Sequence, residues 1–443
     1  MKKLLSVLVC MIMIVTALSM QPTWSNADGS SLDEGIALMK AGDEVAAFSA
    51  IKKAADEGVT EAFGKLAWMY FTGTGVEYDG WKALSWVQKG VAVNDPESML
   101  LQGWNYTTEM TDSNREKALD IFQKLAELDD PVYRGYALNE LGWICASSPE
   151  NNMEQAIEYY QKAADLGNPN AMLNLADIYG WQYPEYRDYE AALKYYVSCL
   201  ECTPWDISEH FVAGCNYALD KERLDKDALN DLYYTGYQIR EPQDGSKPNY
   251  DLALRYHEMA AEYGDARAAS WLFYAYNNDD DIGVERNLEK SLKWAKRVLE
   301  IHEVSPDEYT NDVADVFNLL VGDCYLHSWG TEQDYSEALN CYIRSYELGN
   351  IDALDCIRNG ANNLLTGIVV EIDQDIPLAL EWYNKAIELG SGEAAYELAS
   401  FYKYGFQPDD GYNLKSFPIN LDKAKEYYDI AESLGHRVEE TNE

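Results

Sequence analysis

One short pattern recurs along almost the whole sequence. In its clearest copy, residues 153–180, apolar side chains such as Ala156 and Tyr160 recur every three or four residues. Such spacing predicts amphipathic helices. Gly167 interrupts the run and can close a helix in the left-handed conformation, and Pro169 suits the first turn of a second helix. A helical hairpin cannot bury both of its faces alone, so the pattern requires stacked neighbours.

The neighbours occur at a fixed phase. The alanine of the first helix has counterparts at intervals of 35–61 residues: Ala47, Ala83, Ala118, Ala156, Ala192, Ala253, Ser291, Ala338, Ala379 and Ala424. Eleven residues later stands the residue expected to close the turn, and eight of the ten are Gly, Asn or Asp, which tolerate positive φ. These eight are Gly58, Asn94, Asp129, Gly167, Gly264, Gly349, Gly390 and Gly435. The sequence therefore predicts an all-α array of helix pairs.

The copies share a more specific motif: Ala–x–x–Trp/Tyr–x–x–Lys–Ala–Ala, a glycine, then Ala–x–x–x–Leu–x–x–x–Tyr. Residues 47–58 read AFSAIKKAADEG and residues 61–76 read EAFGKLAWMYFTGTGV, with a further copy at 379–390 and 393–402. This motif resembles the Sel-one-like repeat, a relative of the tetratricopeptide repeat, over roughly residues 43–435. The resemblance implies a right-handed α-solenoid of antiparallel helix pairs. It also implies a scaffold that binds proteins or peptides, without a cofactor.

The pattern divides the chain into segments. We expect a signal peptide at 1–27, a short lead at 28–42, repeats 1–4 with the first helix of repeat 5 at 43–202, an irregular helical insertion and loop at 203–248, repeats 6–9 with a terminal capping helix at 249–436, and a tail at 437–443. Within the insertion we predict separate helices at 206–219 and 225–234. The Pro- and Gly-containing stretch 241–248 is either a loop, which we favour, or a hinge.

The N-terminus has the features of a secretory signal. Lys2 and Lys3 precede the apolar run 4–20, and small residues at 25–27 form a cleavage site. We therefore expect a secreted, cell-surface or periplasmic protein. An uncleaved membrane anchor is the alternative, because an apolar run of this length is at the lower limit for spanning a bilayer.

The charge of the chain restricts its partners. Asp and Glu outnumber Lys and Arg, 76 to 35, for a formal net charge of −41. Nucleic acids and anionic membrane surfaces require a basic footprint, so neither is an expected partner. The surplus indicates either a basic partner or charge that keeps the array from associating.

No residues group into a catalytic, cofactor or metal site. Cys199 and Cys202 resemble a redox or zinc pair, but they lie at the C-terminal end of a predicted helix beside Glu201, where a thiol pKa is not lowered. Cys341 and Cys356 lie at similar distances from Gly349 on antiparallel helices and are a candidate disulfide pair. Cys324 competes for Cys341, and buried thiols are the alternative.

Most of the aromatic residues fall on the predicted core stripes. Trp181, Tyr183 and Tyr186 share one loop and are candidate partner-binding residues, since Trp and Tyr are common binding anchors. The leading interpretation is an exported, non-catalytic scaffold that binds a protein or peptide on its concave surface. The alternatives are a cell-envelope-active enzyme or β-lactam-binding protein of the cysteine-rich repeat type, and a passive structural spacer.

Overall fold

The structure is a computed structural model of the chain, and it describes residues 31–148, 152–203, 210–278, 283–369, 372–406 and 414–437. The predicted signal peptide lies outside these ranges. The described residues are almost entirely helical, and their one strand-like contact is an antiparallel bridge between Phe406 and Phe417. The chain divides into two compact units, unit 1 and unit 2, which meet between Thr235 and Gly236.

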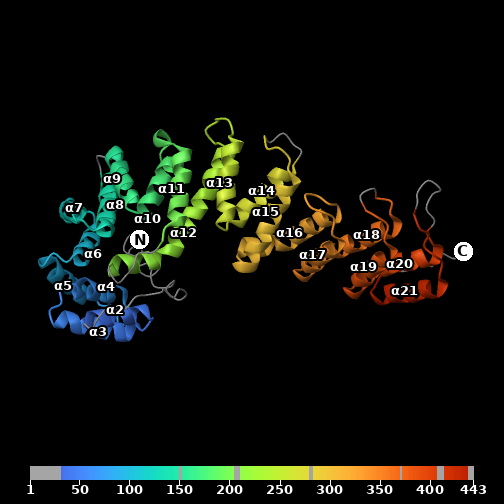
Figure 1. Ribbon diagram of the computed structural model, residues 1–443, viewed down its shortest axis with the longest axis horizontal. Helices are drawn as coiled ribbons and strands as arrows, with labels where there is room; N and C mark the ends of the chain where they lie inside the picture. Colours follow the sequence, from blue (N-terminus) through green and yellow to red (C-terminus); the bar gives the residue numbers. More distant parts are fainter. Residues whose placement is uncertain are drawn as a thin grey trace. The chain divides into compact units, whose positions relative to one another are not determined.

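In unit 1 the helices follow one another as antiparallel neighbours (Figure 1). They are α2 (Ser31–Lys40), α3 (Glu44–Asp56), α4 (Ala62–Thr72), α5 (Gly80–Ala92), α6 (Pro96–Thr107), α7 (Asp112–Ala126), α8 (Pro131–Ser147), α9 (Met153–Asp165), α10 (Pro169–Asp177), α11 (Tyr189–Glu201) and most of α12 (Phe211–Arg240). A π-helical turn, η1 (Ile178–Gln182), and a 3-10 turn, η2 (Pro184–Tyr186), connect α10 to α11.

Unit 2 continues the same succession from the end of α12. Its helices are α13 (Tyr250–Glu262), α14 (Ala266–Asn277), α15 (Leu288–Val304), α16 (Glu308–Leu326), α17 (Tyr335–Glu347), α18 (Asp352–Thr366), α19 (Ile376–Glu388), α20 (Gly392–Tyr404) and α21 (Leu421–Ser433). The ten anchor positions of the repeat are all buried in the two units, none more than 3% exposed. The prediction of an α-solenoid is confirmed.

Seven helices end in the same way. They are α3, α5, α9, α13, α17, α19 and α21. The residue at the predicted turn position has positive φ at Gly58, Asn94, Gly167, Gly264, Gly349, Gly390 and Gly435. The next N–H then donates to the carbonyl five residues back, over 2.8–3.1 Å, as Asn168 N does to Ala163 O. This is the Schellman arrangement, which satisfies carbonyls that a helix end leaves free.

At Asp129 the structure differs from the expected turn. Asp129 is not among the described residues with positive φ. Here α7 ends without the closing bond to the carbonyl five residues back, and Asp130 instead caps α8 through Val132 N (2.9 Å) and Tyr133 N (3.2 Å). A side chain makes the left-handed conformation costly, and Asp lacks the freedom that Gly has at six of the seven turns above, Asn94 being the seventh.

The sequence pattern takes two helices joined by a glycine turn as one unit, but these are not the helices that pack most extensively. Packing is more extensive across the longer connections, as between α8 and α9 or α18 and α19, than across the glycine turns. The reason is a small residue facing a large ring. A Cβ on Gly142 would lie 2.8 Å from the Tyr160 ring, and one on Gly360 would lie 2.3 Å from the Trp382 ring. Gly103 with Phe122 and Gly322 with Tyr342 repeat this contact.

In the described part of the insertion, from residue 210 onward, one long helix stands where two were predicted, and residues 206–209 of the first predicted helix lie outside the described residues. Helix α12 runs unbroken from Phe211 to Arg240, and the expected break between 219 and 225 is absent. Ion pairs one turn apart, Lys221 with Asp225 and Arg223 with Asp227, support this part of the helix. After α12, Asn249 N donates to Ile239 O over 3.1 Å. This hydrogen bond joins the two ends of the loop that contains residues 241–248.

Candidate functional site

The first turns of α12 are buried against three earlier helices of unit 1. Residues 210–216, which we call the docked segment, pack on a surface made by α4, α6 and α8. Phe211, Val212 and Ala213 have no exposed surface. We define this surface, the α4–α6–α8 face, by the side chains that contact the segment. They are Lys65, Trp68, Glu97, Asp130, Tyr133 and Tyr136.

A buried ion pair lies at the centre of the face. Lys65 Nζ on α4 lies 2.8 Å from Glu97 Oε2 on α6, and the two side chains are 7% and 1% exposed. The second carboxylate oxygen, Glu97 Oε1, accepts a hydrogen bond from Val212 N over 3.1 Å. The N–H groups of the first helical turn have no partner inside the helix, so Glu97 satisfies one of those of α12.

A second carboxylate holds the residue before the helix. His210 Nε2 lies 2.8 Å from Asp130 Oδ2, and the His210 ring packs edge-on to the Tyr133 ring at 5.3 Å. Burial alone would raise the pKa of Asp130, but the hydrogen bonds from His210 and from the Tyr133 and Val132 N–H groups hold that pKa below its ordinary value. Asp130 is therefore a carboxylate acceptor that serves both α8 and the docked segment.

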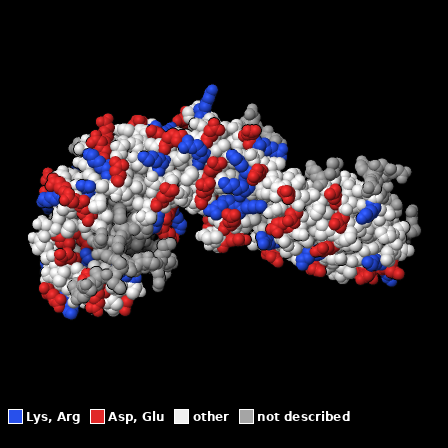
Figure 2. Space-filling view, viewed as in Figure 1, with Lys and Arg blue, Asp and Glu red and all other residues white. Residues whose placement is uncertain are grey.

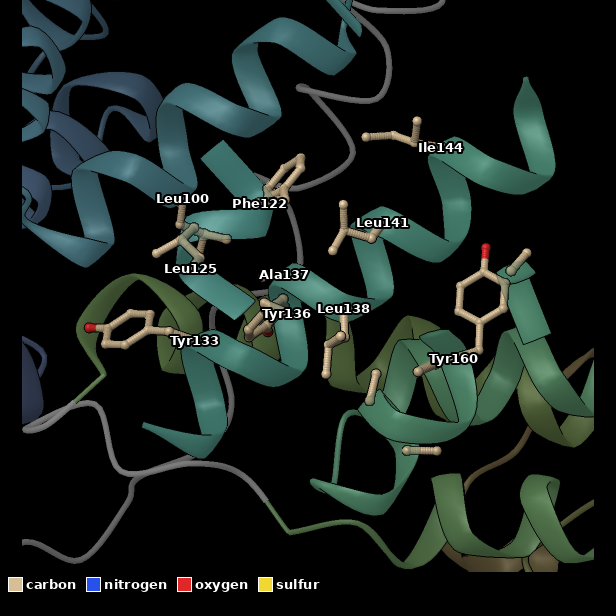
Figure 3. Packing of buried hydrophobic residues seen from close by; sticks show 14 of the residues in the cluster. Leu100, Phe122, Leu125, Tyr133, Tyr136, Ala137, Leu138, Leu141, Ile144 and Tyr160 are labelled. Carbon is tan, nitrogen blue, oxygen red and sulfur yellow. The ribbon is translucent and has the colours of Figure 1, made fainter. Parts of the chain in front are cut away.

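The remaining contacts of the face are with the Phe211 ring, the Ala213 carbonyl and the Asn216 side-chain amide. The Phe211 ring packs edge-on to Trp68 at 5.6 Å, and Lys65 Nζ lies 5.9 Å from its centroid. Tyr136 OH donates to Ala213 O over 3.2 Å, and Trp68 Nε1 donates to Asn216 Oδ1 over 3.1 Å. Figure 3 shows Tyr133 and Tyr136 on α8, with Leu138, Leu141 and Ile144 farther along the same helix.

The face therefore holds a peptide segment by its backbone and by its side chains together. Carboxylates of the face bind a backbone N–H and the imidazole of the segment. Donors of the face bind a carbonyl and an amide oxygen, and the Phe211 ring packs beside Trp68 and Lys65. The face thus contacts both the backbone and the side chains of the segment.

A second polar cluster lies at the end of α10, beside the loop predicted to bind a partner. Asp177 Oδ1 accepts from Tyr196 OH (3.0 Å) and Trp181 Nε1 (3.3 Å), and Asp177 Oδ2 accepts from Gln182 Nε2 (3.4 Å). Burial and the nearby charge of Asp231 on α12 raise the pKa of Asp177. Burial also raises the pKa of Asp231. Two carboxyl groups that influence each other in this way favour one shared proton.

The three predicted loop aromatics differ in exposure. Trp181 is 42% exposed within η1, whereas Tyr183 and Tyr186 are half-buried against the unit 1 core, with their rings 6.4 Å apart. Trp181 is thus the accessible member of the group. Its indole N–H is already directed toward Asp177.

The described cysteines are all free thiols, so no bond joins Cys341 to Cys356 in this structure. Burial raises the pKa of both thiols to about 11. Burial also raises the pKa of Cys199, to about 12. No group of three or more His, Cys, Asp or Glu side chains within the described ranges is arranged to hold a metal ion. Among the helices that the structure describes, none is both long and apolar enough to cross a bilayer.

Sequence reasoning missed the α4–α6–α8 face, although a signal was present. Lys65 lies in the apolar run AFGKLAW of α4, where a charged side chain must point into the packed helices. Glu97 begins the apolar stretch of α6 in the same way. Two buried charges of opposite sign in neighbouring repeats indicate a pair, but the docked segment that completes it lies 115 residues from Glu97.

Outside the α4–α6–α8 face, the surface carries both negative and positive charges. Figure 2 shows acidic side chains at many places on the visible side of the described residues, with basic side chains among them. Many of the basic groups are paired one helical turn away, as Lys124 is with Asp120 at 2.7 Å and Arg297 with Glu300 at 3.1 Å. Such pairs on exposed helices contribute little to stability.

The fold defines a helical-repeat protein of the α-solenoid class. The Sel1 repeat family model matches nine stretches, at 64–94, 99–130, 135–168, 169–197, 232–265, 266–297, 318–350, 360–391 and 392–436. These stretches cover more than half of the chain, and the chain belongs to the Sel1 repeat family. Sel1 repeat proteins generally mediate protein–protein interactions and are generally non-catalytic scaffolds.

Solved structures of repeat proteins resemble the chain at low identity. A protective antigen of uropathogenic Escherichia coli with an SLR fold is 20% identical, with 91% of this chain and 79% of that chain covered and a TM-score of 0.38. A Sel1 repeat protein from Oxalobacter formigenes is 20% identical, with 62% and 100% covered and a TM-score of 0.38. An immunity protein from Pseudomonas aeruginosa is 18% identical, with 66% and 90% covered and a TM-score of 0.24. Among curated proteins no match was found.

Proposed function

We propose that this Sel1 repeat protein is an exported, non-catalytic scaffold that binds a peptide segment of a partner protein on the α4–α6–α8 face. One observation supports this proposal above the others. The face already holds a peptide, the docked segment, through Glu97, Asp130 and Tyr136 as well as through apolar packing. A surface that contacts both backbone and side chains of a segment can select a sequence.

Export is supported by the N-terminal sequence alone. Lys2 and Lys3, the apolar run 4–20 and the small residues at 25–27 are arranged as in a secretory signal. Fractionation of producing cells, with mass spectrometry of the mature N-terminus, tests it. A mature chain beginning at Asp28 outside the cytoplasm is expected, and a full-length chain in the membrane fraction would establish the anchor alternative.

The binding role is tested by photo-crosslinking in producing cells. A photoreactive phenylalanine analogue replaces Trp104 on α6, whose ring packs edge-on to Tyr136 at 5.7 Å, close to the docked segment. The control replaces Trp81 on α5, which is 86% exposed. We expect one protein to be captured from position 104 and not from position 81.

The outcome also decides between the proposal and a passive spacer. No captured protein at position 104, or the same set of proteins at both positions, contradicts partner binding at this face and favours the spacer. A basic partner, attracted by the acidic surplus of the chain, would show a capture yield that falls steeply as salt is raised.

A further inference from the structure

We propose that the docked segment is an internal ligand, which occupies a binding site for the start of a helix in a partner protein and is displaced when that helix binds. The inference rests on the proposed function and names the chemistry of the partner. Its basis is that the α4–α6–α8 face is built by repeats that lie elsewhere in the chain, and that the polar groups of the face are matched to the segment.

The face and its occupant belong to different parts of the chain. All three helices of the face lie largely within family-matched repeats, at 64–94, 99–130 and 135–168. The docked segment lies in 198–231, the longest stretch between two matched repeats. Repeats of a solenoid are stabilised by their immediate neighbours, so the three that form the face do not require an insertion from farther along the chain.

The chemistry of the face is that of recognition. A surface that only had to be covered would be apolar, because buried ion pairs contribute less to stability than apolar packing of similar volume. This face instead buries Lys65 and Glu97 and leaves one carboxylate oxygen for an incoming N–H, which Val212 supplies. Such an arrangement accepts few segments, because an occupant without a free N–H at that place leaves one buried carboxylate oxygen of Glu97 without a hydrogen bond.

The contacts specify the occupant. It is the first turn of a helix, since Glu97 accepts an N–H that a helix interior would already use. It carries an aromatic residue that packs between Trp68 and Lys65, as Phe211 does. The residue before it has a ring that donates a hydrogen bond to Asp130, as His210 does. Small residues follow, and an amide side chain stands five residues after the aromatic one, as Asn216 does after Phe211.

Displacement requires only the end of a helix to unwind. Helix α12 has 30 residues, and the docked segment includes no more than its first six. The ion pairs of α12, Lys221 with Asp225 and Arg223 with Asp227, lie beyond the segment and persist when it leaves. Helix termini open far more readily than helix interiors, so a competing helix needs to replace only the contacts described above.

Peptide binding to the full-length mature chain tests the proposal. The probe is a fluorescent peptide with the sequence of residues 207–220, ISEHFVAGCNYALD, with serine in place of its cysteine. In the Phe211→Ala chain the internal ligand is weakened and the face is intact. Fluorescence anisotropy should show this variant binding the peptide at least tenfold more tightly than the wild-type chain. A peptide with alanine at the phenylalanine should bind neither chain.

The wild-type chain supplies a second measurement in case Phe211→Ala does not fold. Hydrogen exchange of the amides of residues 211–216 should accelerate severalfold when the wild-type chain is saturated with the peptide, while the amides of 221–235 keep their protection. Unchanged exchange of residues 211–216 when the wild-type chain is saturated with the peptide overturns the proposal. Equally tight binding by the Trp68→Ala,Phe211→Ala chain also overturns it, because the peptide would then bind elsewhere.

A second copy of the chain is the competing occupant. If the Phe211→Ala change converts a dimer into a monomer in light scattering, the segment is exchanged between copies and the proposal is wrong. The proposed function is judged separately. If the peptide does not bind but position 104 still captures a partner, the internal-ligand inference fails and the scaffold proposal stands. If position 104 captures nothing, the scaffold proposal fails as well.

Discussion

The two units contain the same tyrosine–aspartate contact in different surroundings. In unit 1, Tyr196 OH donates to Asp177 over 3.0 Å, and in unit 2, Tyr342 OH donates to Asp323 over 2.7 Å, with 19 residues between the partners in each case. Burial raises the pKa of both carboxyl groups. Only in unit 1 does a second carboxyl group, Asp231 of α12, add its charge.

Ion pairs between successive repeats show the same contrast. Lys65 and Glu97 in unit 1 are 7% and 1% exposed, and the docked segment covers them. Arg358 on α18 and Glu397 on α20 in unit 2 lie 3.4 Å apart and are 18% and 27% exposed. The repeats thus supply similar polar pairs in both units. What makes those of unit 1 consequential is their burial by α12, since the cost of losing a partner grows with burial.

The largest expected effect separates the two ion pairs. Glu97→Gln should destabilise unit 1 by about 3–5 kcal/mol, because it leaves the Lys65 ammonium buried without its counter-ion. The matched change Glu397→Gln should cost less than about 1 kcal/mol, as expected for a pair that water still reaches. Urea unfolding followed by hydrogen exchange in each unit measures both. Equal losses would show that α12 does not set the difference.

A smaller effect tests whether both units pack glycine against an aromatic ring. Gly142→Ala in α8 and Gly360→Ala in α18 should each destabilise by about 1–3 kcal/mol, because the new methyl group overlaps Tyr160 or Trp382. The control is Gly135→Ala, also in α8, where the nearest atoms lie 3.6 Å away. That change should be neutral or stabilise by up to about 1 kcal/mol through helix propensity. Thermal unfolding of the three variants suffices.

The carboxyl pair of unit 1 should make its stability depend on pH. The folded pKa of Asp177 is raised above the unfolded value of about 4, so the folded state binds the extra proton. This contribution is complete below pH 4 and is lost as the pH rises through about 7.

The measurement compares wild type with Asp177→Asn in urea unfolding from pH 4.5 to 8. The comparison is needed because burial also raises the pKa of Glu140, to about 7. We expect the variant to lose less stability than wild type over this range. Parallel curves would show that the pair does not share a proton.

The smallest expected effect on stability is at Trp181. Trp181→Ala should change the unfolding free energy by less than about 0.5 kcal/mol, because the side chain is 42% exposed and its hydrogen bond to Asp177 is long at 3.3 Å. If the loop also contacts the partner, capture from position 104 falls in this variant. Unchanged capture would confine recognition to the α4–α6–α8 face.

The local part of this fold was predictable, and its long-range part was not. Ala156 and Gly167 mark a helix stripe and a turn because helix periodicity and left-handed geometry are properties of neighbouring residues. The preference for pairing across the longer connections depends on Gly142 meeting Tyr160 in space. The contact of Val212 with Glu97 joins residues 115 positions apart, so no local pattern in the docked segment indicates it. Two separate helices were predicted where α12 runs unbroken.

Most of α12 lies in the longest stretch between two matched repeats, which has a consequence for how the chain could be shortened. The stretch 198–231 begins with the last four residues of α11 and ends within α12, one residue before the next matched repeat. Excising it would join α11 at 197 to the last nine residues of α12, from 232, and bring two matched repeats into succession. The shortened protein would keep all nine matched repeats and present Glu97 and Trp68 to solvent, a ready starting scaffold for selecting helical peptides from a library.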